Sequence, residues 1–211
     1  MLTQIHRPIF SMQHDKMRIE DVWIGEPYIE RVQFAGGFFQ NGDEPLHFND
    51  VQFKHVRFNG ANLEEMHFTD VLFDTCDFSN AQLKNTHFHR CQFKGVKLTG
   101  ADFSQALFGH VLFENGEAQY SDFSLSRTNH VAFHQMDLTE SNFFDCHFKQ
   151  TFFVRNLLHR ASFIETNLAN IDLSTNQYDT IEVTIEKLSN CIVSERQAIG
   201  FAKLLGLHIT E

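Results

Sequence analysis

The hydrophobic pattern in the middle of the chain repeats every five residues. Between residues 48 and 173, 24 of 26 positions spaced five apart hold Phe (17) or Leu (7), and the exceptions are Ala118 and Thr128. Strand faces repeat every second residue and helix faces about every 3.6 residues, so neither regular element explains a period of five. The pattern therefore predicts a repeat architecture with a five-residue unit.

A second position in each pentad is also restricted. The residue two before each Phe or Leu centre is mostly small, as at Ala61 and Ala101, and the other positions are mainly polar. One large and one small side chain per pentad then point inward, as in coils that stack and cover one another's faces. Cys76, Cys91 and Cys146 occupy the small position, so we expect buried thiols there and neither disulfides nor metal ligands.

The residue types within the repeat also follow a distinctive pattern. The stretches "GANLEE", "TGADFSQ" and "YSDFSL" fit the pattern A-[DN]-[LF]-x-x, which resembles the pentapeptide-repeat family. The resemblance covers residues 48–173 without a break in the frame. It implies an all-β fold, a right-handed quadrilateral parallel β-helix in which four pentads make one turn, followed here by a short C-terminal helix.

The two ends of the chain depart from the regular repeat. We divide the sequence into an N-terminal segment with degenerate first coils (1–45), the β-helix (46–178) and a C-terminal capping or dimerisation module (179–211). Before residue 48 the frame survives only at Trp23, Tyr28 and Phe38. In the tail, Ser194 and Gln197 match a capping box, which predicts a short helix up to Leu205 that is ended by Gly206. The last apolar stretch, "LHI" at 207–209, predicts a final strand.

The tail carries a narrower resemblance. The ending "CIVSERQAIGFAKLLGLHITE" resembles the C-terminal module of Qnr-type quinolone-resistance proteins. This resemblance implies a homodimer formed through the C-terminal end, which binds DNA gyrase and topoisomerase IV and protects them from fluoroquinolones. Many Qnr proteins have two loops that interrupt the pentad frame. The unbroken frame here favours the loop-free type, such as the mycobacterial fluoroquinolone-resistance protein.

Apolar side chains also occupy outward positions in the late coils, including Phe144 and Ile164, and they crowd the predicted helix. Contiguous exposed apolar surface marks an interface. Either the tail covers it within one chain, or a second subunit covers it across a two-fold axis. The predicted dimer interface consists of Phe152, Val154, Leu157, Ile199, Phe201, Ala202, Leu204, Leu205, Leu207 and Ile209.

Charge is distributed unevenly around the predicted coil. The net charge of −10 argues against direct binding to nucleic acid, which requires a basic surface. If residues twenty apart share a face, one face has a net charge of −5, with Lys84 as its single base. We expect this acidic face to mimic DNA and occupy the basic saddle of gyrase; the alternative is a solvated face that keeps the rod soluble. Its acids are Glu64, Glu65, Asp102, Asp122, Asp145 and Glu165.

Histidines gather on a different face. Seven of the 13 lie there, but Leu107 and Arg127 interrupt the row and the rungs point in parallel. A metal site requires three or four converging ligands, so we expect no metal and no cofactor. The seven are His47, His67, His87, His89, His110, His130 and His147.

The sequence carries no catalytic signature such as G-x-S-x-G, a P-loop, H-E-x-x-H or C-x-x-C, and a column of Phe and Leu leaves no room for a ligand. We therefore expect a binding protein and no enzyme. The N-terminus has no continuous apolar segment, which predicts a cytoplasmic protein without a membrane span. Two alternatives remain to gyrase binding: a generic interaction rod or adaptor with an unidentified partner, and a small-molecule or metal-binding module on the histidine face.

Overall fold

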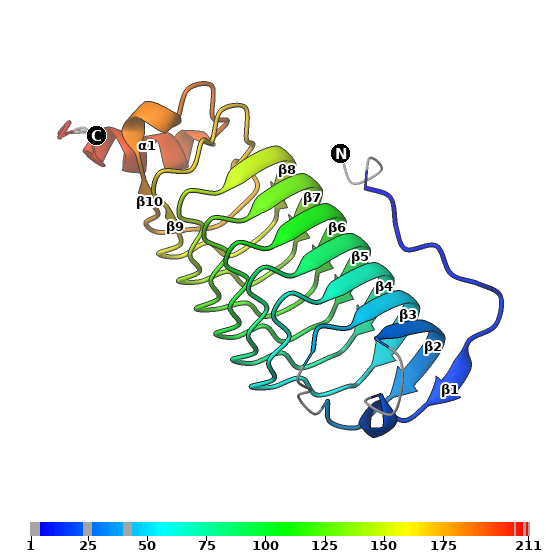
Figure 1. Ribbon diagram of the computed structural model, residues 1–211. Helices are drawn as coiled ribbons and strands as arrows, with labels where there is room; N and C mark the ends of the chain where they lie inside the picture. Colours follow the sequence, from blue (N-terminus) through cyan, green and yellow to red (C-terminus); the bar gives the residue numbers. More distant parts are fainter. Residues whose placement is uncertain (1–4, 23–26, 40–43, 205, 209, 211) are drawn as a thin grey trace.

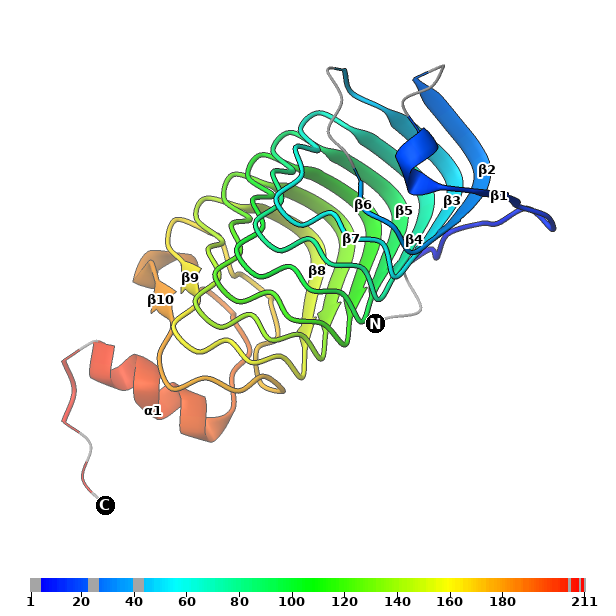
Figure 2. The same ribbon diagram turned by 90° about the horizontal axis from the view of Figure 1, so that it is seen from below.

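The computed structural model describes residues 5–22, 27–39, 44–204, 206–208 and 210. In this part of the chain, coils stack along one axis into a rod, and a helix lies at the C-terminal end (Figures 1 and 2). The strands are β1 (Asp15–Met17), β2 (Tyr28–Ala35), β3 (His47–Lys54), β4 (His67–Asp74), β5 (His87–Lys94), β6 (Leu107–Glu114), β7 (Arg127–His134), β8 (His147–Val154), β9 (Ser162–Phe163) and β10 (Glu182–Val183). The helices are the 3₁₀ turns η2 (Ile19–Asp21) and η3 (Ile185–Lys187) and the α-helix α1 (Glu195–Leu204).

The strands pair in parallel in the order of the chain, from β1 to β8. From β3 to β8 each paired residue lies opposite the residue twenty positions later in the next strand, for example His47 opposite His67 and Phe53 opposite Phe73. Single bridges on the other sides keep the same offset, as between Asp102 and Asp122. Four pentads therefore make one turn, and the predicted right-handed quadrilateral β-helix is confirmed.

Each long strand bends at its fourth residue. Asp50 and Asp70 have φ angles of 55° and 54°, and neither takes part in the pairing between β3 and β4. This left-handed conformation recurs in the residue two after most pentad centres, such as Glu65 and Gln105. It turns the chain through a corner every five residues, so the β-helix has flat sides.

Stacked phenylalanine rings fill the core. Phe48, Phe68, Phe88 and Phe108 form a column with ring centroids 5.1–5.2 Å apart. Rings of adjacent sides meet edge-to-face, as Phe68 and Phe73 do at 5.3 Å. Both arrangements are favoured by the quadrupole of the ring and add to the free energy of burying it. The five-residue period is thus explained by one inward ring per side of the coil.

The first coil corrects the frame that we expected before residue 48. Tyr28 and Phe38 are exposed, whereas Ile29, Phe34 and Phe39 are buried. Strand β2 pairs with β3 at an offset of nineteen, Tyr28 opposite His47, so this coil is one residue shorter than the others. The expected frame is wrong by one residue at these positions, and Trp23 lies outside the described residues.

The predicted C-terminal helix is confirmed as α1. The backbone N–H of Ser194 donates to Oε1 of Gln197 over 2.8 Å, and the N–H of Gln197 donates to the Ser194 hydroxyl over 3.4 Å, which is the reciprocal capping box. Gly206, with φ of 77°, follows the helix. The predicted final strand is wrong for Leu207 and His208, which are in no strand; the strand near this end is β10, paired with β9.

Candidate partner-binding surface

The acidic residues lie on one side of the rod, but they occupy three different columns. Asp102 and Asp122 are on neighbouring rungs of one column, which runs through Asn62, Gln82, Asp102, Asp122, Asn142 and Ser162. Glu64 follows a pentad centre, and Glu65, Asp145 and Glu165 occupy left-handed corner positions. The predicted acidic face is therefore a broad band of carboxylates along this side of the coil.

Backbone N–H groups hold the carboxylates of Asp102 and Asp122 in their column. Asp102 Oδ1 accepts the N–H of Ser104 over 2.8 Å, and Asp122 Oδ1 accepts the N–H of Ser124 over 2.8 Å. Asp122 also accepts a hydrogen bond from Asn142 Nδ2 over 3.0 Å. Such bonds to the residue two positions later are typical of Asp and Asn in turns. They fix these carboxylates on the outside of the rod.

Five of the six acids are in no ion pair with another described residue. Glu165 is the exception, because Lys187 Nζ lies 2.8 Å from its Oε2, and this hydrogen bond holds the pKa of Glu165 below its usual value. The field of the band therefore comes from Glu64, Glu65, Asp102, Asp122 and Asp145.

Apolar side chains share this side of the rod. Leu125, Phe144 and Ile164 are exposed, and each belongs to the same side of the coil as the acids. Sequence reasoning noted Phe144 and Ile164 but did not place them beside the acidic band, and it missed Leu125. The signal for Leu125 was its outward position in the pentad. We name the five unpaired carboxylates with these three apolar residues the acidic surface.

The residues predicted for the dimer interface come from different parts of the fold, and the dimer stays a prediction. Phe152 packs in a cluster with Ile5, Leu112 and Ala132. Leu157 is on another side, in a column with Asp137 and Gln177. Val154, Phe201 and Ala202 are half-buried, Ile199 and Leu207 are exposed, and Leu205, Ile209 and the Leu204 side chain lie outside what is described.

The tail itself covers the end of the β-helix within the chain. The side chain of Gln197 is buried, and its Nε2 donates to the carbonyls of Leu173 and Asn176 over 3.1 and 2.9 Å. The ring of Phe201 meets Tyr178 edge-on at 6.5 Å. The last coil exposes backbone groups at its end; Gln197 satisfies the carbonyl of Asn176 and adds a bond to that of Leu173, which also accepts the N–H of Asn176.

The histidine rings meet along their side of the rod, some stacked and some edge-on, so they are not all parallel as we expected. The ring of His47 lies 4.5 Å from that of His67, which lies 4.4 Å from that of His87. Among the described residues no three His, Cys, Asp or Glu side chains are arranged to hold a metal ion.

The thiols of Cys76, Cys91 and Cys146 are buried and unpaired with one another, and burial raises their pKa values to about 12, 12 and 11.

Comparison with known proteins identifies the repeat. A family model described as "Pentapeptide repeat region" matches residues 66–143, and one described as "Pentapeptide repeats (8 copies)" matches residues 132–174. Together they span more than half of the 211 residues. The chain belongs to the pentapeptide-repeat family.

Solved structures of pentapeptide-repeat proteins are similar to this one. A trypsin-treated variant of QnrB1, a plasmid-mediated fluoroquinolone resistance protein, is 19% identical, with 87% of this chain and 90% of that chain covered and a TM-score of 0.51. HetL, involved in heterocyst differentiation regulation in the cyanobacterium Nostoc sp. strain PCC 7120, is 13% identical, with 86% and 88% covered and a TM-score of 0.34. No curated protein sequence matches the chain. The likeness to QnrB1 shows a shared fold.

The described residues of this pentapeptide-repeat protein include no helix that is long and apolar enough to cross a lipid bilayer.

An N-terminal arm, residues 5–17, is a feature that the sequence did not predict. It runs from β1 back along the rod toward β8 (Figure 1). The N–H of Ile9 donates to Asp70 Oδ1 over 2.9 Å, and Asp50 accepts the Ser11 N–H and lies 2.7 Å from His14 Nε2. Burial raises the pKa of Asp50, but the hydrogen bonds from Ser11 and His14 outweigh it and leave this pKa below its usual value. Asp50 and Asp70 are thus arm-binding residues.

The lowered pKa values of three of these histidines predict a loss of folding stability in mild acid. Burial, and then neighbouring positive charges, lower the pKa of His67, His89 and His110 below that of a free histidine. A depressed pKa means that their stabilising contribution is complete above about pH 6.5 and is lost as the pH falls through the folded-state values. We expect a lower urea midpoint at pH 5.5 than at pH 7.5, measured by circular dichroism.

The matched control for this prediction is the double variant His67→Asn and His110→Asn. It removes two titrating rings without adding a charge, so the difference between the two midpoints should shrink. An unchanged difference would assign the acid sensitivity to other groups.

Proposed function

We propose that this pentapeptide-repeat protein binds DNA gyrase and topoisomerase IV through its acidic surface and protects them from fluoroquinolones. The observation that carries the proposal is the band of five unpaired carboxylates on one side of a rigid rod. A basic surface that normally holds DNA would attract such a band. The fold shared with QnrB1, described as a fluoroquinolone resistance protein, is consistent with this role.

Charge alone is too sparse to imitate DNA. The rungs of the coil are about 4.8 Å apart, and not every rung carries an acid, whereas duplex DNA has one phosphate per ~1.7 Å. Shape and apolar contact must therefore contribute. Leu125, Phe144 and Ile164 provide apolar area beside the carboxylates, as in the core of a typical protein interface.

The contact surface would be the flat side of the β-helix. Residues 48–173 follow the twenty-residue ladder without an insertion, so the loops found in many Qnr proteins have no counterpart there.

We further propose that the protein acts by binding and not as an enzyme, and that it does not bind nucleic acid directly. A homodimer joined through the C-terminal end would place two acidic surfaces along one longer rod.

A supercoiling assay tests the proposed function. Purified gyrase that is inhibited by a fluoroquinolone should regain its supercoiling activity on relaxed DNA as the protein is titrated in at micromolar concentrations. Inhibition without the drug would still indicate binding, but it would contradict protection. No effect on either the drug or the enzyme would contradict both, and it would favour the alternative of an adaptor rod with another partner.

A further inference from the structure

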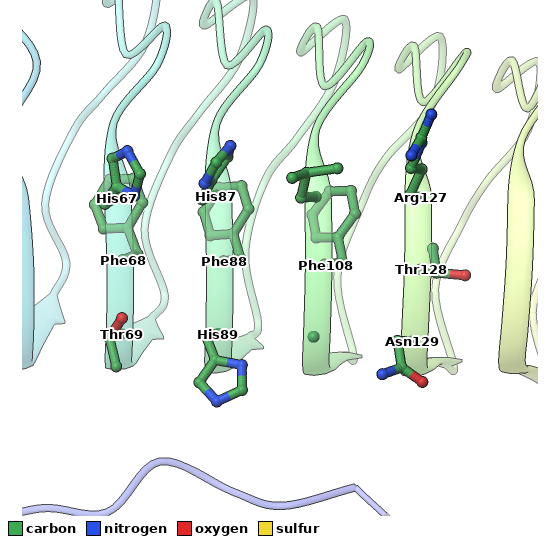
Figure 3. A pocket seen from close by; sticks show the side chains of 12 residues that line it. His67, Phe68, Thr69, His87, Phe88, His89, Phe108, Arg127, Thr128 and Asn129 are labelled. Atoms are coloured by element: carbon green, nitrogen blue, oxygen red, sulfur yellow. The ribbon is translucent and has the colours of Figure 1, made fainter.

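A groove runs along the histidine side of the rod, across strands β4 to β7 (Figure 3). Its volume of about 420 Å³ is within the range of small-molecule sites, and it is open to solvent. One edge is formed by residues that precede a pentad centre and the other by residues that follow one. The first row is His67, His87, Leu107 and Arg127, and the second is Thr69, His89, Gly109 and Asn129.

The lining of the groove contains hydrogen-bond donors and no carboxylate. Arg127 can only donate, and it is in no ion pair with another described residue. Asp70, which follows Thr69 in β4, is already held by Arg90, whose Nε and Nη2 donate to its two oxygens over 2.7 and 2.6 Å. The groove therefore suits a ligand whose oxygens only accept, such as a phosphate.

The orientation of His89 adds a donor aimed into the groove. Arg90 Nη1 lies 2.6 Å from His89 Nε2, and because a guanidinium can only donate, Nε2 is the acceptor. The proton of the neutral ring is then on Nδ1. A Cβ added at Gly109 would lie 3.0 Å from this Nδ1, so the N–H borders the space that the glycine leaves empty.

The donors form two groups. His87 and His89 are two residues apart and project from the same face of β5, at opposite edges of the groove (Figure 3). Arg127 and Asn129 do so on β7, two rungs away, at a distance of roughly 10 Å. Between them, on the intervening strand β6, lie the half-exposed Leu107 and the notch at Gly109. The two groups could hold two anionic groups of one molecule, with its less polar part over Leu107.

We propose that this groove binds a small molecule that carries two phosphate groups, one held by His87 and His89 and the other by Arg127 and Asn129. A peptide fits less well, because each strand from β4 to β7 is already paired on both edges and no strand can be added there. The site is separate from the acidic surface, so it does not depend on gyrase binding.

Calorimetric titration of the full chain tests this site, with fructose 1,6-bisphosphate as the probe and inorganic phosphate for comparison. We expect the bisphosphate to bind more tightly, and Arg127→Gln to weaken it by at least about tenfold, because a charge-assisted hydrogen bond is lost. Lys97→Gln is the matched control: Lys97 is also exposed and also precedes a pentad centre, but it lies on another side. This control should leave the affinity unchanged.

A second variant tests the notch. Gly109 is not in the left-handed region, so Gly109→Ala is tolerated by the backbone, but the new methyl group displaces the His89 ring and should weaken the bisphosphate. Three results would overturn the proposal: no saturable binding at millimolar bisphosphate, equal affinity in Arg127→Gln and the unchanged protein, or binding only of an acidic peptide or single-stranded nucleic acid.

Discussion

Replacing Phe103 with alanine is expected to lower the free energy of unfolding by about 3–5 kcal/mol. The side chain is fully buried, and its ring stacks on Phe123 at 5.0 Å and meets Phe93 and Phe113 edge-on at 6.3 Å. The lost ring leaves a cavity, because the backbone around it is fixed by the ladders on every side of the coil and cannot collapse. Urea unfolding followed by circular dichroism measures the change.

Phe144→Ala is the control for this prediction. Phe144 is also a phenylalanine of the β-helix, but it is 40% exposed and outside the core. Its removal should cost no more than about 0.5 kcal/mol. Similar losses for Phe103→Ala and Phe144→Ala would contradict a core that depends on stacked inward rings.

Neutralising three acids should weaken gyrase binding by at least about tenfold while the fold stays intact. The triple variant is Asp102→Asn, Asp122→Asn and Asp145→Asn. Asn62 and Asn142, in the same column as Asp102, accept the N–H of Glu64 and Phe144 with their side-chain oxygens, so asparagine preserves the turn. Asp145 has φ of 47°, a conformation that asparagine also tolerates. Binding can be measured by surface plasmon resonance with immobilised gyrase.

The matched control removes the same amount of charge from other sides of the rod. Asp77, Asp137 and Asp172 also precede a pentad centre, and each accepts the N–H of the residue two positions later. Their triple replacement by asparagine should leave gyrase binding within about twofold of the original. Equal losses in both triple variants would mean that net charge, and not the acidic surface, governs the interaction.

The sequence predicted the regular part of the fold because one ring per five residues leaves a single consistent frame. The prediction failed where the frame shifts by one residue. At Tyr28 and Phe38 the aromatic residues suggested the twenty-residue frame, but the coil is one residue shorter and buries Ile29 and Phe34 instead. Phe34 and Phe39 mark the shifted frame, but a frame that is extended backward from residue 48 does not pass through them.

The candidate sites were predicted less completely than the fold. The acids could be assigned to one side from their spacing alone, but the ion pair between Glu165 and Lys187 depends on how the tail folds back. The sequence did not reveal the arm because its acceptors, Asp70 for the N–H of Ile9 and Asp50 for Ser11 and His14, have the pattern of ordinary outward residues. The groove depends on the rotation of the His89 ring, which Arg90 sets.

The constant offset of twenty residues between strands has a consequence for how such proteins change over time. A duplication or deletion of one whole turn leaves every side chain on its original side of the coil, whereas a change of one residue breaks the five-residue frame within the coil where it falls, as in the shorter first coil. The distance from the carboxylates of Asp102 and Asp122 to helix α1 can therefore change in steps of one rung, about 4.8 Å. Selection can in this way adjust the length of the molecule to the span of a partner without redesigning its core.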